Sequence, residues 1–324
     1  MKSNANVGVS GVEGAERQRV AVLVLSKGVP AATVVALAQR FAVLVPADPG
    51  GLERLVADHG QRIRGIATTG KALLDRALLQ RLSALEIVAC YSAGLDNIDT
   101  DALAERGIAL TNSSAALADE VADLAIALMV MARRRLVAAD AHVRSGAWAA
   151  GTFPLGRSLS GARLGVLGLG HIGSGIARRA EAMGMYPRYC ARRPVPGCAY
   201  PYYPNAEALA SDSDVFVVAC PGGARNRGLV NAAVLAALGP ESTLVNIARG
   251  EIIDEPALVE ALATGKLGSA GLDVFAHEPH IPRKLRNLEN VVLTPHLGSA
   301  TIETRNAMGE CVVQSLAQAL DHNI

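Results

Sequence analysis

The chain has 324 residues, with 31 Lys and Arg against 30 Asp and Glu, and only 3% of its residues are aromatic. This near-neutral balance gives no electrostatic basis for binding nucleic acid or an anionic membrane, and the few aromatics argue against base stacking. The length predicts two domains with sizeable cores.

Residues 1–17 are rich in Gly, Asn, Ser and Val without a long apolar stretch, which predicts a loose N-terminal tail rather than a signal peptide. The longest helical apolar run, residues 124–132, is too short to span a membrane. Five cysteines without CxxC spacing indicate buried thiols in a reducing compartment and no metal site. We therefore expect a cytoplasmic protein.

From residue 18 to 115, apolar runs alternate with Ala- and Leu-rich stretches, which is typical of parallel α/β architecture. Helices are expected at residues 31–41 and 71–82. The predicted strands are residues 20–25, 42–45, 65–67, 87–90 and 108–110. This part is the predicted substrate (catalytic) domain, with a flavodoxin-like doubly wound sheet.

An uninterrupted helical pattern at residues 116–135 opens the second predicted domain, which extends to residue 298. That helix carries enough apolar residues to suggest a homodimer element, although burial between domains explains it nearly as well. Residues 299–324 are expected to form a helix that returns to the first domain. Six further strands, predicted at residues 163–167, 186–190, 214–219, 243–247, 270–273 and 291–293, make a complete Rossmann domain.

A glycine-rich turn lies between the first of these strands and the helix after it, where residues 168–173 read Gly-Leu-Gly-His-Ile-Gly. Gly168 allows a tight turn, Gly170 lets the backbone approach a pyrophosphate, and Gly173 permits close helix–strand contact. The next strand ends in Tyr-Cys-Ala-Arg-Arg-Pro with no carboxylate for a ribose hydroxyl. Because two guanidiniums bind a 2′-phosphate well, Arg192 and Arg193 predict NADPH over NADH, unless they are merely solvated.

Three further charged residues each follow a strand-like run: Arg249, Glu278 and His296. If the runs are parallel neighbours, these side chains meet at one edge of a sheet, where they can bind a carboxylate and protonate a carbonyl oxygen. Singly, each is as well explained by a surface ion pair, a helix cap or a structural His. Together with the glycine turn, they predict hydride-transfer chemistry on a small oxo acid.

The four motifs around these sites occur in the order Gly-Leu-Gly-His-Ile-Gly (168–173), Asn-Ile-Ala-Arg-Gly (246–250), Gly-Leu-Asp-Val-Phe (271–275) and Pro-His-Leu-Gly-Ser (295–299). In this order they resemble the D-isomer-specific 2-hydroxyacid dehydrogenases. Tyr-Ser-Ala-Gly-Leu-Asp (91–96), Arg-Ser-Gly-Ala-Trp (144–148) and Asn-Leu-Glu-Asn-Val-Val (287–292) look most like the glyoxylate/hydroxypyruvate and hydroxyphenylpyruvate reductases of that family.

The resemblance implies that His296 is the general acid, that Glu278 orients its ring and that Arg249 grips the oxo acid. The backbone of Ala93 and Gly94 would hold the substrate carboxylate. Thr69, after a first-domain strand, is a further pocket candidate, with Trp148 and Phe153 as apolar neighbours. The expected cofactor-binding residues are Gly168, Gly170, His171, Ile172, Gly173, Ala191, Arg192, Arg193, Cys220, Pro221, Asp273 on the nicotinamide side, and Gly298.

The expected activity is NADPH-dependent reduction of glyoxylate, hydroxypyruvate or an aryl pyruvate to the D-2-hydroxy acid. Two alternatives stay open: a dehydrogenase of another small anion such as formate or phosphite, and a dinucleotide-sensing protein like the related corepressors. One loop departs from the family pattern, because residues 222–226 read Gly-Gly-Ala-Arg-Asn where a Leu-Thr-Pro-Glu-Thr-like segment is usual. Its glycines are expected to loosen a loop that runs beside the cofactor.

Overall fold

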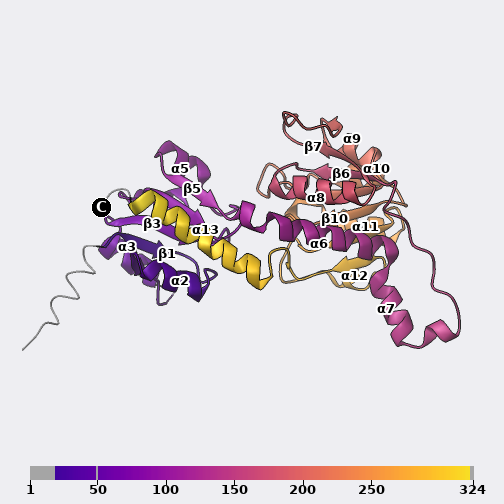
Figure 1. Cartoon of the computed structure of the whole chain (residues 1–324), viewed down its shortest axis with the longest axis horizontal. Helices are drawn as coiled ribbons and strands as arrows, with labels where there is room; N and C mark the ends of the chain where they lie inside the picture. Colours follow the sequence, from indigo (N-terminus) through magenta and orange to yellow (C-terminus); the bar gives the residue numbers. More distant parts are fainter. Residues whose placement is uncertain (1–18, 49, 322–324) are drawn as a thin grey trace, which may run out of the picture. The chain divides into compact units, whose positions relative to one another are not determined.

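The computed structural model describes residues 19–48 and 50–321, so the predicted tail, residues 1–17, lies outside the described residues. The chain forms two compact units (Figure 1). One contains the described residues up to Leu117 together with those from Ile302 onward, and the other contains Ala118–Thr301. Each unit has its own parallel sheet.

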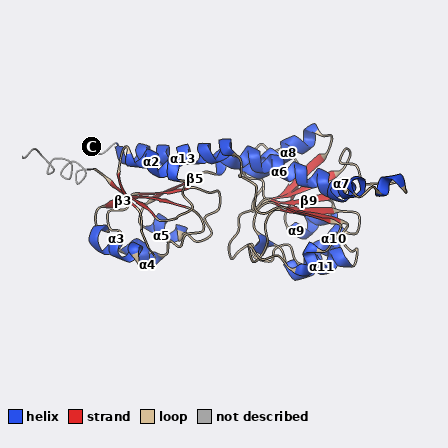
Figure 2. Cartoon of the chain, turned by 90° about the horizontal axis from the view of Figure 1, so that it is seen from below, coloured by secondary structure: helices blue, strands red, loops and turns tan. Residues whose placement is uncertain are grey.

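The first unit is a five-stranded sheet in the order β2-β1-β3-β4-β5, the order typical of flavodoxin-like folds. In Figure 2, α2 and α13 cover one face of it, and α3, α4 and α5 cover the other. Its elements are β1 (Ala21–Val24), α2 (Ala31–Ala38), β2 (Ala42–Leu44), α3 (Gly51–His59), β3 (Ile63–Thr68), α4 (Arg76–Gln80), β4 (Ile87–Cys90), α5 (Thr100–Glu105), β5 (Ala109–Asn112) and α13 (Ile302–Leu320).

The second unit is a seven-stranded parallel sheet in the order β12-β11-β10-β9-β6-β7-β8. Helices α6 and α8 lie on one face, and α9, α10 and α11 lie on the other (Figure 2). The elements from α6 onward are α6 (Ser114–Arg134), α7 (Leu136–Arg144), η1 (Ala147–Ala149), β6 (Arg163–Leu167), α8 (His171–Ala182), β7 (Tyr186–Cys190), β8 (Tyr202–Tyr203), α9 (Ala206–Ser211), β9 (Val215–Val218), α10 (Ala232–Leu238), β10 (Thr243–Asn246), η2 (Gly250–Ile252), α11 (Glu255–Ala263), β11 (Ser269–Leu272), α12 (Arg283–Arg286) and β12 (Val291–Leu293).

The central strands form because their apolar residues are buried on both faces of each sheet. All four residues of β9 and all four of β11 are buried, as helices on both sides of a parallel sheet require. The two doubly wound domains expected from the sequence are confirmed. The predicted count of six strands in the second domain was wrong, because β8 adds a two-residue strand beside β7.

One predicted helix was also too long. The residues 71–82 expected as a helix contain only α4, which begins after Asp75. The Asp75 carboxylate accepts a hydrogen bond from the Leu78 backbone N–H at 2.8 Å, and this cap fixes where the helix starts. The preceding Leu74 is extended and pairs with Ile98.

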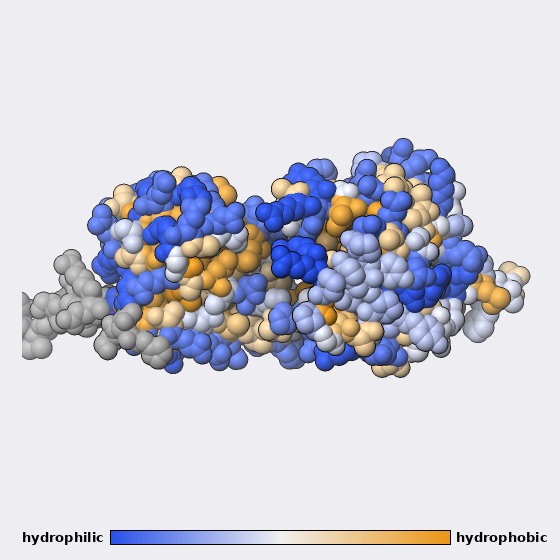
Figure 3. Space-filling model, turned by 90° about the horizontal axis from the view of Figure 1, so that it is seen from above, coloured by the Kyte–Doolittle hydropathy of each residue, from blue (hydrophilic) through white to orange (hydrophobic). Residues whose placement is uncertain are grey.

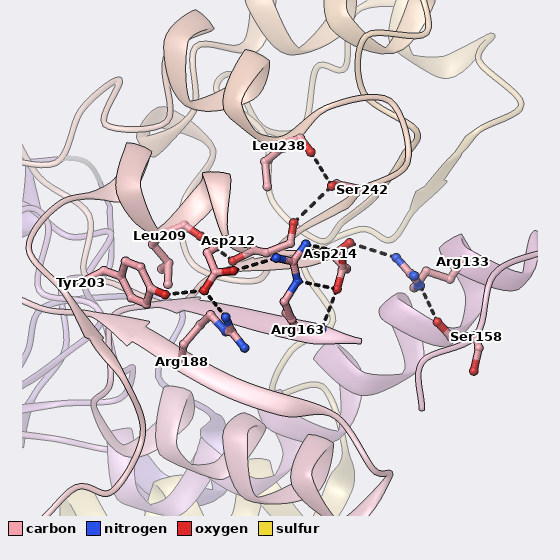
Figure 4. Close-up of polar contacts among 11 residues, drawn as sticks. Arg133, Ser158, Arg163, Arg188, Tyr203, Leu209, Asp212, Asp214, Leu238 and Ser242 are labelled. Atoms are coloured by element: carbon pink, nitrogen blue, oxygen red, sulfur yellow. Dashed lines mark hydrogen bonds and ion pairs between the residues drawn. The ribbon is translucent and has the colours of Figure 1, made fainter. Parts of the chain in front are cut away.

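A charged network closes the amino-terminal edge of the second sheet (Figure 4). Arg163 binds Asp214 at 2.9 Å and Asp212 at 2.7 Å. Asp212 also accepts hydrogen bonds from Arg188 on β7 and Tyr203 on β8. The network therefore links β6, β7, β8 and the segment leading into β9. Its guanidiniums and hydrogen bonds hold the pKa values of both Asp carboxyls below their usual range.

Candidate active site

Arg249, Glu278 and His296 follow three neighbouring strands of the second sheet. Arg249 comes three residues after β10, Glu278 lies in the loop after β11, and His296 comes three residues after β12. Because β10, β11 and β12 are parallel neighbours, all three loops leave the same edge of the sheet. The expected grouping of the trio at one sheet edge is therefore what the strand order produces.

His296 and Glu278 form a direct pair, with 2.8 Å between the imidazole Nδ1 and the carboxylate Oε2. The other oxygen of Glu278 accepts the Phe275 backbone N–H at 3.3 Å, which anchors the carboxylate to its own loop. An ionised carboxylate requires Nδ1 to donate, so Nε2 is left to face a reactant. The His296 side chain is 38% exposed, so it is accessible to a small molecule.

Asp273 holds the loop that carries His296. Its carboxylate accepts hydrogen bonds from Thr294 Oγ1 at 2.6 Å, the Leu297 N–H at 2.7 Å and the Gly298 N–H at 2.9 Å. Its backbone carbonyl accepts the His296 N–H at 2.9 Å. Since Asp273 is 1% exposed and His296 has a left-handed backbone with φ of 57°, this set of bonds keeps the His296 loop in an unusual conformation.

The Arg249 loop is held by Asn246, the last residue of β10. The Asn246 side chain donates to the Arg249 carbonyl at 2.9 Å and accepts the Ala248 N–H at 3.0 Å. Gly250 then packs on the Glu278 loop, because a methyl group there would lie 1.9 Å from the Phe275 carbonyl carbon. The Arg249 loop and the loop bearing Glu278 are thus in backbone contact. Asn246 belongs to the sequence motif at residues 246–250, but its role in holding the loop depends on a turn that the motif does not specify.

The glycine turn has room for a pyrophosphate. Gly168 has φ of 102°, and a methyl group on Gly173 would lie 2.0 Å from the Gly168 carbonyl oxygen. A methyl group on Gly170 would meet no described atom within 4 Å, so the space above the start of α8 is open. The free N–H groups of the first turn of α8 point there, and His171 is exposed beside it. These residues fit a dinucleotide.

The end of β7, next to the glycine turn, is basic. Arg192 and Arg193 are exposed, and within the described residues neither forms an ion pair with a carboxylate. Two thiols lie near this edge, Cys190 at the end of β7 and Cys220 after β9. Burial raises the pKa of the Cys220 thiol to about 12 and also raises that of Cys190, so both stay uncharged. The only fixed charges that the end of β7 presents are the two guanidiniums.

Hydrogen bonds hold the loop after β9 in a turn. The Asn226 N–H donates to the Gly223 carbonyl at 3.0 Å, and its side chain donates to the Pro221 carbonyl at 2.8 Å. Gly223 has φ of 98°, a conformation that favours glycine. Its N–H donates to Glu251 Oε1 at 2.8 Å. Gly223 therefore serves a defined turn.

The substrate-binding residues expected in the first unit also lie together. Thr69 follows β3, Ala93 and Gly94 follow the neighbouring β4, and a methyl group on Gly70 would lie 2.1 Å from the Gly94 carbonyl oxygen. Thr69 Oγ1 is 2.9 Å from Ser26 Oγ. Among the described residues, the backbone N–H groups of Ala93 and Gly94 donate no hydrogen bond, so both are available to an anion.

Trp148 and Phe153 belong to the second unit, whereas Thr69, Ala93 and Gly94 belong to the first. Both aromatic residues lie on the segment after α7, in the second unit. This part of the chain begins just after Arg133, which donates to the Asp214 carbonyl at the amino-terminal edge of the sheet. Phe153 packs against His142, with 5.4 Å between ring centroids. Within the second unit they therefore lie at the edge opposite the catalytic trio, and the expectation that they join the Thr69 wall rests on the sequence alone.

These features define a nicotinamide-dinucleotide-dependent dehydrogenase. They are a doubly wound sheet with a glycine turn, a basic end of the strand after that turn, an Arg, and a Glu–His pair. Residues 126–298 match the sequence-family model described as D-isomer specific 2-hydroxyacid dehydrogenase, NAD binding domain. The chain belongs to the D-isomer specific 2-hydroxyacid dehydrogenase family, as the motif resemblance predicted.

Three similar proteins support this assignment. Glyoxylate/hydroxypyruvate reductase A of Arabidopsis thaliana is 47% identical over 81% of this chain and 84% of the relative. Hydroxyphenylpyruvate reductase of Plectranthus scutellarioides is 46% identical over 81% and 83%. The structure of an NADPH-dependent glyoxylate/hydroxypyruvate reductase from Sinorhizobium meliloti, solved with NADP and malonate, matches with a TM-score of 0.83, 39% identity and coverage of 93% and 94%.

Two further findings concern membranes and metals. Across residues 19–48 and 50–321, every helix is too short or too polar to cross a bilayer. In the same ranges, no three His, Cys, Asp or Glu side chains gather in a way that would hold a metal ion. The five cysteines, all of them described, are free thiols.

Proposed function

We propose that this protein is an NADPH-dependent reductase that converts a small 2-oxo acid into the D-2-hydroxy acid. The observation that carries the proposal is the 2.8 Å His296–Glu278 pair beside the Arg249 loop at one sheet edge. A bound nicotinamide cofactor supplies the hydride. The residues named below bind and orient the substrate and move a proton.

In this proposal, Nε2 of His296 gives its proton to the carbonyl oxygen as negative charge develops there. Glu278 keeps Nδ1 protonated and the ring in one orientation, so the proton leaves from the correct nitrogen. Arg249 binds the substrate through two parallel hydrogen bonds and stabilises the charge on oxygen. Ala93 and Gly94 offer backbone N–H groups to the carboxylate, and Thr69 contributes to the pocket wall.

The proposed NADPH preference is supported by the two arginines at the end of β7. Gly168, Gly170, Gly173 and the first turn of α8 would hold the pyrophosphate, with Ile172, Cys220, Pro221 and Gly298 beside the cofactor. Arg192 and Arg193 would bind the 2′-phosphate, since neither pairs with a carboxylate in the described structure. No Asp or Glu stands directly after β7 to repel the phosphate. The solved relative from Sinorhizobium meliloti contains NADP, which supports this choice.

The proposed substrates are glyoxylate, hydroxypyruvate and aryl pyruvates, because the named relatives reduce molecules of these classes. The test is to follow NADPH and NADH absorbance with glyoxylate, hydroxypyruvate, phenylpyruvate and a buffer control, and, starting from NADP⁺ or NAD⁺, with formate and phosphite. We expect NADPH oxidation with at least one oxo acid and a higher kcat/KM than with NADH. Reduction of NADP⁺ by formate or phosphite, or no turnover with any compound, would reject the proposal.

We also propose a cytoplasmic homodimer. The apolar surface that supports it lies on α7 and the segment after it, where Val137, Val143, Trp148 and Leu155 are between 51% and 98% exposed. In Figure 3, apolar residues lie on the surface at the outer end of α7 and the segment after it. On α6, Val121 and Leu128 are buried, whereas Leu124, Ile126, Val130 and Met131 are partly exposed, so this helix stays a second candidate dimer element. Light scattering of the wild type and of Trp148→Glu is the test.

A further inference from the structure

The 220–228 loop links the nucleotide turn to the Arg249 segment within the second unit. At its start it touches the turn, because a methyl group on Gly168 would lie 2.6 Å from the backbone of Cys220. At its end, the Gly228 N–H donates to the Glu251 carbonyl at 2.9 Å. The loop is therefore anchored at both ends to other parts of the unit. Its central residues are positioned by a further contact.

Glu251 provides that contact. Oε1 accepts the Gly223 N–H at 2.8 Å, and Oε2 pairs with Arg227 at 2.9 Å. The carboxylate is 30% exposed, so it is partly shielded from water, and a hydrogen bond to a charged acceptor is stronger than a neutral one. Glu251 lies in η2, two residues after Arg249, so one short segment carries both the substrate arginine and the support of the loop.

We propose that Glu251 is a positioning residue that sets the 220–228 loop for dinucleotide binding. The proposal rests on the proposed function, because it takes the glycine turn as the dinucleotide site. Without the Glu251 carboxylate, the Gly223 N–H loses its acceptor and the turn keeps only the Asn226 bonds to Gly223 and Pro221. Gly222 and Gly223 then gain part of the wide backbone freedom of glycine. The loop would then have to be ordered when the cofactor binds, and that entropy is lost from the affinity.

The effect should fall on cofactor binding more than on turnover. Arg249 has its own support, since the Asn246 side chain donates to its carbonyl at 2.9 Å. The backbone bond from Gly228 to Glu251 does not depend on the side chain at residue 251. A Glu251→Ala protein should therefore fold and, once saturated with NADPH, reduce the oxo acid within about threefold of the wild-type kcat. Loss of one charge-assisted hydrogen bond predicts an NADPH Kd raised about tenfold.

The experiment is a fluorescence titration of the full chain with NADPH, and in parallel with NADH, which measures binding without turnover. The variants are Glu251→Ala, Glu251→Gln, Glu251→Asp and Arg227→Ala, and the matched control is Glu260→Ala, an exposed acid on α11. Circular dichroism melting checks folding. Gln keeps an oxygen acceptor for Gly223 and should restore most of the affinity. Asp keeps the charge but is too short, and should bind as weakly as Ala.

Arg227→Ala should stay near the wild-type Kd, because the Arg227 side chain is 71% exposed and such ion pairs contribute little. Wild-type affinity in both Glu251→Ala and Glu251→Asp would overturn the positioning role while leaving the proposed reaction intact. A Gln variant as weak as the Asp variant would also overturn it. If the wild type bound neither dinucleotide, the proposed function itself would fail. If Ala does not fold, the Gln and Asp variants decide the matter.

Discussion

Replacing Asp273 with Asn tests how the His296 loop is held. The two side chains have nearly the same shape, so the change removes charge and one acceptor without opening a cavity. One Asp273 oxygen accepts two donors, Thr294 Oγ1 and the Leu297 N–H, and the other accepts the Gly298 N–H. An Asn amide nitrogen at either position faces a backbone donor. The less costly orientation places it against Gly298.

That orientation loses one charge-assisted hydrogen bond and leaves two buried donors facing each other. Together these two effects lower the free energy of unfolding by about 3 kcal/mol, because Asp273 is 1% exposed and water cannot replace the lost bonds. For a unit of this size, such a loss lowers Tm by about 6–12 °C. Because His296 donates its backbone N–H to the Asp273 carbonyl, a shifted loop also misplaces the imidazole. We expect kcat to fall by about 100-fold.

The assay combines a calorimetric melt with steady-state oxo-acid reduction. The matched control is Asp254→Asn, whose carboxylate caps α11 by accepting the Ala257 N–H at 3.1 Å. Asn is an equally good cap, so the control should change Tm and kcat little. If Asp273→Asn melted with the wild type and turned over within twofold of it, the carboxylate would not be what holds the catalytic loop.

Three further predictions concern other parts of the second unit. Changing Arg192 and Arg193 together to Ser should weaken NADPH binding by at least 100-fold and leave NADH binding within about threefold; equal losses would refute the phosphate contact. Glu278→Gln should lower kcat by roughly 100-fold with an unchanged Kd for NADPH, and a kcat near wild type would mean that the ring needs no orienting group. Because the folded pKa values of Asp212 and Asp214 are lowered, their stabilisation is complete above the unfolded value of about 3.9 and is lost as pH falls through the folded values. Asp214→Asn should flatten the acid side of a Tm-against-pH curve below about pH 4, and a parallel curve would contradict this linkage.

The sequence predicted that Arg249, Glu278 and His296 would lie at one sheet edge, because each lies in the loop after a strand. In a parallel sheet, strand direction alone sends every following loop to the same edge, so chain order and strand periodicity suffice. The same reasoning placed Thr69 and Ala93 at one edge of the first sheet. The glycine turn could also be predicted from the sequence, because the turn itself brings the backbone too close to residue 173 for any side chain.

The supporting residues could not be predicted in this way. Asn246, Glu251 and Thr294 act through turns whose dihedral angles no short motif specifies. Asn246 bonds within its own loop, whereas Glu251 and Thr294 each contact a residue on another loop. Asp273 was expected only on the nicotinamide side, and the structure adds that its carboxylate oxygens accept bonds from the His296 loop. The extent of α4 depended on one capping Asp, and β8 is too short to leave a periodic signal.

The arginines of the second unit show why location decides function more than residue type. At the amino-terminal edge of the sheet, Arg163 and Arg188 bind carboxylates that the chain itself supplies, so these charges are used internally (Figure 4). At the carboxyl edge, Arg192 and Arg193 are exposed and, within the described residues, have no carboxylate partner. Arg192 follows Arg188 by only four positions, across the end of β7. In the proposed function, a 2′-phosphate gives Arg192 and Arg193 the anionic partner that Asp212 gives Arg163 and Arg188, because no carboxylate follows β7.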